Sequence, residues 1–127
     1  MCAQLERLTF GSNFKQPIDI LFNCAQLQQL TFRRSFNQPI YVLSKCTKLQ
    51  QPIFDRHFNK SIGALSNYIQ LEKLVFGPCF KHSINALVKC TVLNIIYFTE
   101  NIDRRFQVLC WSLPNLNISR YLYDDGW

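Results

Sequence analysis

The sequence predicts a solenoid, in which short coils of one repeating unit stack and place a parallel β-sheet along one wall. Phenylalanine and leucine each recur at one fixed interval over most of the chain. The two ladders are Phe10, Phe32, Phe54, Phe76 and Phe98, and Leu5, Leu27, Leu49, Leu71 and Leu93. A fixed period of this length is the signature of a stacked repeat protein, whose units are stable only when neighbours bury each other's flanks.

The unit reads L-x-x-L-x-F-x-x-x-F-x-x-P-I-x-x-L-x-x-C-x-x. Its first six positions end in alternation, which predicts a strand of about four residues with one face buried. We expect such a strand at the start of each repeat, near Leu5, Leu27, Leu49, Leu71 and Leu93. The return segment has turn-like I-x-x-L spacing, although residues 39–43 are rich in strand formers. The fold is therefore expected to be mainly β, with short strands or 3₁₀ turns on the return wall and little or no α-helix.

The pattern changes at both the middle and the end of the array. Pro52 takes an inward leucine position of the third strand and removes a ladder donor, so we expect a local distortion or a missing pairing there. Leu113, Leu116 and Ile118 predict a partial sixth strand, in which Leu113 follows Leu93 two positions sooner than the repeat requires. From about Leu113 the chain is expected to cap the last coil, and residues 1–127 to form a single domain.

Four cysteines share one repeat position, with a tyrosine in the middle of the series. They are Cys2, Cys24, Cys46 and Cys90, interrupted by Tyr68. Buried cysteine behaves as a small hydrophobe, so a ladder of free thiols is favoured. A disulfide between Cys24 and Cys46 is not excluded by the distance between coils, but its geometry in register is poor. Cys79 and Cys110 lie off the ladder, and their redox state is open.

The composition indicates the class of protein and its place in the cell. Hydrophobic residues make up 48% of the chain and charged residues 17%, which is ordinary for a globular domain. No apolar run reaches the length of a membrane span, and the first residues lack the pattern of a signal peptide. We therefore expect a protein of the cytoplasm that does not bind membranes.

The motif itself resembles that of a known family. Residues 14–18 read FKQPI and residues 36–40 read FNQPI, each inside a 22-residue L-x-x-L-x-F frame. Phe10-Gly11 and Phe76-Gly77 add a second signature. The chain resembles FNIP-repeat proteins over about residues 2–110. These form a class of leucine-rich repeats of social amoebae and of giant viruses that infect amoebae. The third and fourth copies depart from the motif, with Ser61 and Ser83 in place of proline.

The resemblance implies a leucine-rich-repeat-like solenoid or horseshoe used for protein–protein contact, in the host cytoplasm if the protein is viral. In this family an F-box often precedes the repeats, which makes the array a substrate-recognition module of a ubiquitin ligase. No room for an F-box exists ahead of Leu5, so the expected function is that of a related scaffold without the F-box. The partner is expected to be a protein of unknown identity.

The resemblance also implies where that partner binds, because the non-leucine positions of each strand face the concave wall. The central ladder would be Thr9, Thr31, Ile53, Val75, Tyr97 and Asn117. An exposed apolar stripe edged by arginine has the composition of an interaction hot spot. We call the candidate set the concave face: Arg33, Arg34, Ile53, Arg56, Lys73, Val75 and Tyr97. The same residues are also compatible with an ordinary sheet surface and with solubility.

The first coil starts without a recognisable capping sequence. Its side chains Leu5, Leu8, Phe10 and Phe14 are then expected to form an open apolar flank beside a bare sheet edge. Such an edge is a route to self-association, so a homo-oligomer formed through this end is a second expectation.

Catalytic, metal and cofactor sites are not predicted. His57 and His82 occupy different repeat positions, and the motif from Cys79 to His82 supplies only two of the four ligands of a closed zinc site. A nucleophile–base pair of Cys79 and His82 lacks an orienting third group. We therefore expect a non-enzymatic protein without a cofactor.

Nucleic acid or another acidic surface is the alternative partner. It is suggested by the net charge and by Lys60, His82 and Arg104 at one repeat position, with Arg105 beside them. The other basic residues are spread around the coil without interleaved aromatic residues. We therefore expect a protein partner rather than a nucleic acid.

Overall fold

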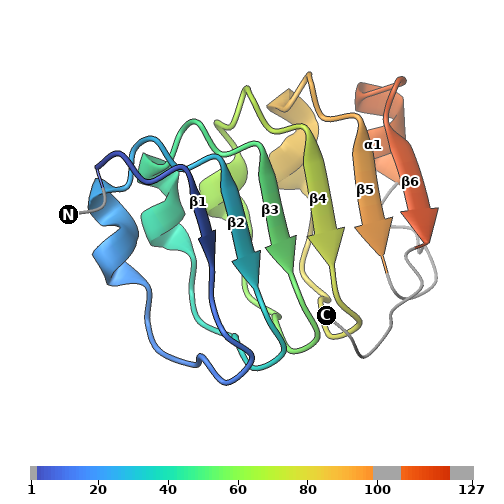
Figure 1. Cartoon of the computed structure of the whole chain (residues 1–127). Coiled ribbons are helices and arrows are strands. Elements are labelled where there is room, and N and C mark those ends of the chain that lie inside the picture. The colour runs from blue at the N-terminus through green and yellow to red at the C-terminus, as the bar shows by residue number, and fades with distance from the viewer. Residues whose placement is uncertain (1–2, 99–106, 121–127) are drawn as a thin grey trace.

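The structure is a computed structural model, and it describes residues 3–98 and 107–120. Its main element is a parallel sheet of six strands in the order β1-β2-β3-β4-β5-β6, so each strand pairs with its neighbours in sequence (Figure 1). The strands are β1 Arg7–Thr9, β2 Gln29–Phe32, β3 Gln51–Phe54, β4 Lys73–Phe76, β5 Ile95–Phe98 and β6 Asn117–Arg120. The predicted fold class is confirmed.

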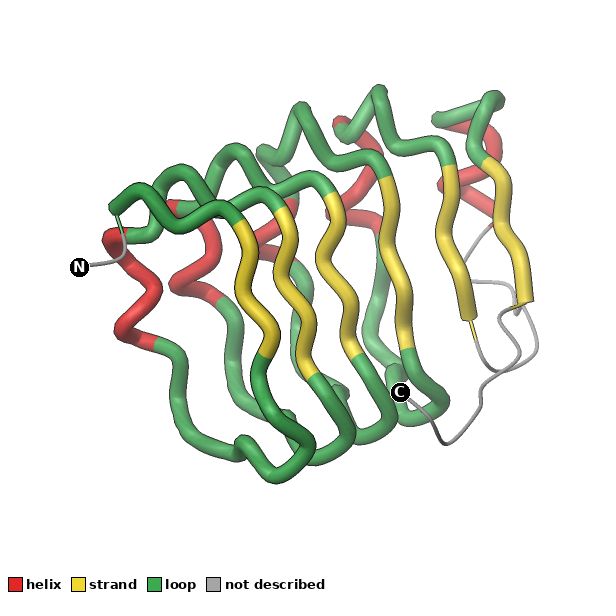
Figure 2. The backbone as a smooth tube through the Cα atoms, viewed as in Figure 1, coloured by secondary structure: helices red, strands yellow, loops and turns green. Residues whose placement is uncertain are grey.

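The return wall consists of single turns of 3₁₀-helix, as expected from the I-x-x-L spacing. These are η1 Asp19–Asn23, η2 Tyr41–Lys45, η3 Gly63–Leu65 and η4 Asn85–Lys89. The six-residue α-helix α1 Gln107–Ser112 takes their place in the next coil. Figure 2 shows this second layer of helical turns behind the strands. None of the described helices is long and apolar enough to span a membrane.

The strands pair with a constant offset of one repeat, from Arg7 with Gln29 to Val75 with Tyr97. The sixth strand keeps this offset, because Ile118 pairs with Ile96 and Ser119 with Tyr97. The prediction of a shortened spacing before this strand was therefore wrong. The residue beside Tyr97 in the ladder is Ser119, and Asn117 pairs with Ile95 instead. Leu113 and Leu116 had been assigned to the sixth strand, but they precede it in the chain.

Two ladders of phenylalanine rings fill the coils. Within a coil the two rings stack closely, as Phe32 and Phe36 do with centroids 3.8 Å apart. Between coils the rings follow the strand repeat, with Phe32 5.6 Å from Phe54 and Phe36 6.1 Å from Phe58. Nearly parallel rings at these distances combine apolar burial with favourable stacking. The period of the sequence is thus the period of the core.

The asparagine of the F-N-x-P-I motif supports the turn of the following coil. The side-chain oxygen of Asn37 accepts a hydrogen bond from the Asn59 N–H at 2.8 Å, and that of Asn59 accepts one from the Lys81 N–H at 2.9 Å. Turn N–H groups lack partners from regular secondary structure. The polar position of the motif is therefore structural rather than a binding residue.

The loss of pairing predicted at Pro52 is confirmed, and it affects only one side of the strand. Pro52 keeps the register of β3 with β2, where it pairs with Leu30. Between β3 and β4 only the pairs Ile53 with Val75 and Phe54 with Phe76 form. A parallel bridge between Gln51 and Lys73 requires the N–H of residue 52 to donate to the Lys73 carbonyl, and proline has no N–H. The sheet accommodates the proline without a cis peptide bond among the described residues.

The cysteine ladder is confirmed in part. The thiols of Cys46 and Cys90 are free and buried, and donate to the carbonyl oxygens of Leu21 and Leu65, each at 3.6 Å. Burial raises the pKa of both, that of Cys90 to about 11, although a backbone hydrogen bond lowers the latter in part. Cys24 is instead disulfide-bonded. The expectation of a free thiol at this position was wrong. Cys79 is free and half-buried, and the Cys110 side chain lies outside the description.

Tyr68 fills the ladder position between Cys46 and Cys90. Its side chain is completely buried and its hydroxyl has no hydrogen-bond partner among the described residues. Burial, with a smaller contribution from Cys46, raises the pKa of Tyr68 far above its usual range. The ring is much larger than the thiols at the equivalent positions, and the turn that precedes it, η3, has three residues where η2 and η4 have five.

Replacing Tyr68 by phenylalanine is expected to raise the free energy of unfolding by about 1 kcal/mol, because it removes an unpaired buried hydroxyl while keeping the ring. The measurement is the urea midpoint followed by circular dichroism. Tyr41→Phe is the matched control, since Tyr41 is 68% exposed and should leave the midpoint unchanged. A lower midpoint for Tyr68→Phe would mean that the hydroxyl is bound in solution.

Candidate interaction surfaces

The predicted apolar stripe of the concave face lies on three adjacent strands. Ile53, Val75 and Tyr97 are register partners on β3, β4 and β5. Ile53 and Tyr97 are half-buried, but Val75 is only 3% exposed. The prediction of an exposed Val75 was wrong, because a short side chain is shielded by larger ones about 4.8 Å away on both sides. Val75 therefore lies between Ile53 and Tyr97 and offers almost no contact area.

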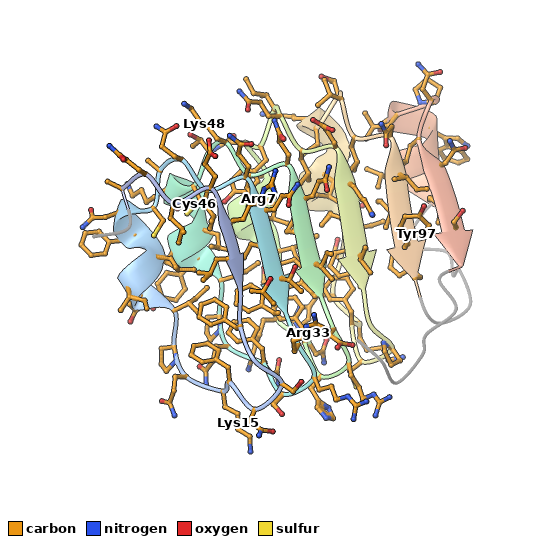
Figure 3. All side chains as sticks on the ribbon, viewed as in Figure 1. Arg7, Lys15, Arg33, Cys46, Lys48 and Tyr97 are labelled. Carbon is orange, nitrogen blue, oxygen red and sulfur yellow. The ribbon has the colours of Figure 1, made fainter. Side chains whose placement is uncertain are left out.

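Lys73 completes this surface. It precedes Val75 by two residues on β4 and so shares its face, and its ammonium nitrogen lies 5.4 Å from the centroid of the Tyr97 ring. A cation at this distance from an aromatic face is held by the ring quadrupole. The interaction favours this orientation of the tyrosine, which Figure 3 shows on β5. A partially exposed aromatic ring that is already ordered loses little side-chain entropy on binding.

The three arginines of the concave face lie where the strands end, as Figure 3 shows for Arg33. Arg33, Arg34 and Arg56 are all half-buried. They surround Asp55, which is only 1% exposed and whose side-chain oxygen Oδ1 accepts the Arg56 N–H at 2.6 Å. The other oxygen, Oδ2, is buried without a hydrogen-bond partner among the described residues. The basic cluster is thus built around a buried carboxylate.

Asp55 was not predicted from the sequence to be part of a site. A signal was present in the alignment of the repeats. The position of Asp55 is occupied by Gly11, Arg33 and Gly77 in the neighbouring copies, so no other copy supplies an acid there. Gly77 lies against this loop, because a Cβ atom on it would come within 2.6 Å of the Asp55 carbonyl carbon.

The carboxyl of Asp55 is subject to opposing effects. Burial raises its pKa, whereas the Arg56 N–H and the charges of Arg56, Arg34 and Arg33 lower it, and the net direction is upward from 3.8. The folded protein therefore keeps this proton to a higher pH than the unfolded chain does. The contribution of Asp55 to stability is complete below pH 3.8 and decreases as the pH rises through the raised pKa.

Asp55→Asn is accordingly expected to gain stability relative to the unchanged protein as the pH is raised from 3 to 7. The asparagine oxygen can still accept the Arg56 N–H, and the side chain cannot ionise. The check is a series of denaturation curves for both proteins across this pH range. A difference in unfolding free energy that stays constant with pH would show that the arginines balance desolvation, and one that turns against the variant at neutral pH would show that they outweigh it.

The predicted self-association flank is an apolar hollow at the β1 end of the solenoid. Leu5, Leu8, Phe10 and Phe14 are all half-buried, whereas their counterparts in the second coil are at most 1% exposed. A cavity of about 550 Å³ opens there. Its lining is Ala3, Leu5, Leu8, Phe10, Ile20, Leu21, Asn23 and Cys24. Ile20, 70% exposed, was not predicted as part of this surface.

The histidines considered for catalysis and metal binding lie on the surface. His57 and His82 are both exposed, and His82 packs at 6.2 Å from the Phe80 ring. No group of three or more metal-ligating side chains occurs in residues 3–98 and 107–120. Of the residues suggested for nucleic-acid binding, Lys60 is half-buried and His82 exposed. Arg104 and Arg105 lie outside the described residues.

Comparison with known proteins settles the fold. No protein-family model and no curated protein matches this sequence, but solved structures do match. One is an internalin (inlF) from Listeria monocytogenes str. 4b F2365, with a TM-score of 0.65 and 18% identity over 90% of this chain. Another is an internalin C2 (inlC2) of the same strain, with a TM-score of 0.65 and 15% identity over 87% of this chain. The chain has a leucine-rich-repeat fold.

The leucine-rich-repeat array is short beside these two structures. It spans 34% of the length of the first internalin chain and 50% of the second. At this level of identity the likeness concerns the backbone and the stacking of coils. The surface residues, which determine binding, have to be argued from this chain alone.

Proposed function

We propose that this chain is a non-enzymatic protein-interaction scaffold whose partner binds the concave face around Tyr97. The observation that carries the proposal is the half-buried Tyr97 ring with the Lys73 ammonium over it, next to Val75 on β4 and two strands from Ile53 on β3. Tyrosine and arginine in an ordered, partly desolvated patch are the residues that dominate protein–protein binding energies. A leucine-rich-repeat sheet presents them on a rigid surface.

Charge indicates the chemistry of the partner. The chain carries a net charge of +6, and three arginines gather around one buried aspartate at the ends of the strands. A complementary protein surface would place apolar side chains on Tyr97 and Ile53, and carboxylates on the arginines, where they can bind in bidentate geometry.

The resemblance to FNIP repeats supports a more specific proposal. The array would then be the substrate-recognition part of a ubiquitin-ligase adaptor, with the F-box supplied elsewhere, acting in the cytoplasm of an amoebal cell or of a host cell if the protein is viral. A partner that is ubiquitinated in a manner dependent on Tyr97 would support this role. A stable complex whose partner is not ubiquitinated would agree with the scaffold proposal and contradict the ubiquitin-ligase role.

The test is co-purification from amoebal lysate with the unchanged chain, Tyr97→Ala and Arg34→Glu, followed by mass spectrometry. The matched control is Tyr41→Ala, which removes an exposed tyrosine from the return wall in η2. We expect a protein captured by the unchanged chain and by Tyr41→Ala to be lost from both concave-face variants. Equal capture by all four proteins would overturn the concave face as the binding surface.

Salt dependence separates this function from the nucleic-acid alternative. Binding to nucleic acid should weaken steeply with salt, because each neutralised phosphate releases counterions. Capture that depends on Tyr97 and changes little with salt supports a protein partner. Retention on heparin that is lost with salt and is insensitive to Tyr97→Ala would favour the alternative.

A further inference from the structure

We propose that the return wall binds single-stranded nucleic acid, with one base stacked on Tyr41 and the neighbouring phosphates held by lysines. The residues lie in the second, third and fourth coils, which begin at Leu27, Leu49 and Leu71. We call them the return-wall site: Tyr41, Lys45, Lys60, Lys81 and Lys89. This wall lies behind the strands in Figure 2, on the opposite side of the coil from the concave face. The proposal therefore adds a second activity and does not rest on the concave face.

The charges on the return wall of these three coils have one sign. The wall consists of residues 37–48, 59–70 and 81–92, which contain five lysines and His82 but no aspartate or glutamate. Lys60 is half-buried, and the other four lysines are exposed. Among the described residues of the whole return wall, one acid occurs, Asp19 in η1 of the first coil. A surface with a single sign of charge attracts polyanions.

The lysines lie on both sides of Tyr41 along the coil. Lys60 and Lys81 are on adjacent turns, since the Lys81 N–H donates to the side-chain oxygen of the asparagine before Lys60 at 2.9 Å. Lys45 and Lys89 are in the last turns of η2 and η4, at equivalent positions two coils apart. Tyr41 is the first residue of η2. A strand that follows the coil can therefore contact lysines before and after the ring.

The Tyr41 ring, 68% exposed, borders a second hollow of about 290 Å³ between the second and third coils. Its lining is Pro39, Ile40, Tyr41, Lys60, Ser61 and Ala64. An aromatic ring, small apolar groups and one cation thus meet at one place on the wall. Stacking on such a ring accepts every base, because every base has a π-face, and a neighbouring cation binds the phosphate.

The hollow exists because the third coil has small residues beside Tyr41. Gly63 occupies the repeat position of Tyr41, and Ala64 that of Val42. The backbone does not require this glycine, since no described glycine has a positive φ. A Cβ atom on Gly63 would meet the Ser61 Oγ at 3.5 Å, an ordinary contact. The missing side chains therefore leave space next to the ring that the fold itself does not demand.

These features favour a single strand over a duplex or a membrane. The bases of a duplex are stacked on one another and are not available to the ring. Lipid headgroups offer phosphates without a planar group for Tyr41. From the sequence, the basic residues lacked interleaved aromatic residues. The fold supplies one, because it brings Tyr41 of one repeat to the same hollow as Lys60 of the next.

The test is fluorescence anisotropy of a labelled single-stranded oligonucleotide of about 12 nucleotides with the full chain, over a range of salt concentrations. Tyr41→Ala is expected to weaken binding about 5- to 150-fold, the range for losing one stacked base, with the same salt dependence. Tyr41→Phe keeps the ring face and should bind as the unchanged chain does. Lys60→Gln and Lys81→Gln should each lower the slope of log affinity against log salt by about 0.7.

Two further variants separate the site from general effects of charge. Lys73→Gln makes the same change of charge on the concave face and should leave the slope unchanged. Gly63→Asp puts a carboxylate in the hollow, and the fold accepts it because the first coil has Asp19 at this position. It should weaken binding as strongly as Tyr41→Ala does. All variants should retain the circular dichroism spectrum of the unchanged protein.

The two proposed activities fail independently of each other. Tyr97→Ala should leave oligonucleotide binding unchanged, and Tyr41→Ala should leave capture of a protein by the concave face unchanged. Heparin is a polyanion and should bind the return wall as well. Retention on heparin that is lost with Lys60→Gln and kept with Tyr97→Ala therefore belongs to this wall, and both activities can occur in one chain.

Four results would overturn the proposal. One is the absence of oligonucleotide binding at low salt, or binding to vesicles of phosphatidylcholine and phosphatidylserine in its place. Another is a Tyr41→Ala variant that binds as tightly as the unchanged chain. The third is a slope that falls as much with Lys73→Gln as with Lys60→Gln. The last is equally tight binding of a duplex of the same length or of adenosine monophosphate, since neither needs a strand across the wall.

Discussion

Phe54→Ala is expected to lower the free energy of unfolding by about 3–5 kcal/mol, the range for removing a buried aromatic side chain. Phe54 is completely buried in the middle of the array. Its ring stacks on Phe32 at 5.6 Å, on Phe58 at 4.3 Å and on Phe76 at 5.9 Å. Alanine would leave a cavity that the coils on both sides cannot close, because the backbone hydrogen bonds of the sheet hold their spacing.

Phe10→Ala is the matched control for this prediction, since it removes the same side chain from the end of the same ladder. Phe10 is half-buried, and among the described residues it has a stacking partner in one neighbouring coil, Phe32. We expect a loss of about 1–2 kcal/mol, because less apolar area returns to water. Urea denaturation followed by circular dichroism measures both variants. Equal losses would contradict the view that each coil is stabilised by two neighbours.

Gly77→Ala is expected to destabilise the protein by about 1–3 kcal/mol, the range for forcing atoms into a packed site. Its Cβ atom would lie 2.6 Å from the Asp55 carbonyl carbon, 2.7 Å from the Asp55 carbonyl oxygen and 2.8 Å from the Arg56 nitrogen. All three are backbone atoms, so the loop itself has to move. The same movement would disturb the hydrogen bond between Arg56 and the Asp55 carboxylate.

Gly11→Ala tests whether this cost comes from the contact and not from glycine as such. Gly11 occupies the same repeat position, and a Cβ atom on it would have no neighbour within 4 Å. We expect no loss of unfolding free energy, or a gain of about 0.4–1 kcal/mol, because alanine has fewer conformations than glycine in the unfolded chain. If both alanine variants lose stability equally, the backbone conformation and not the contact with Asp55 explains the glycine.

The candidate site was predictable to the extent that it follows the repeat. Register placed Ile53, Val75 and Tyr97 side by side because they are spaced by one repeat each, and the structure confirms this arrangement. Exposure was not predictable in the same way. Val75 is buried because its neighbours happen to be larger, and Lys73 reaches Tyr97 by a side-chain conformation that spacing alone does not specify.

The period of the repeat by itself determined the parallel sheet, the order of its strands, the inward residues and the missing pairing at Pro52, because each depends on backbone repetition or on a single missing donor. Only the tertiary structure decided the register of β6, the disulfide state of Cys24 and the burial of Asp55 among three arginines. These features depend on contacts in the folded chain that the spacing of the repeat does not specify. The surfaces proposed for binding lie where the repeat is broken, since identical coils stack on one another and distinct residues remain for partners.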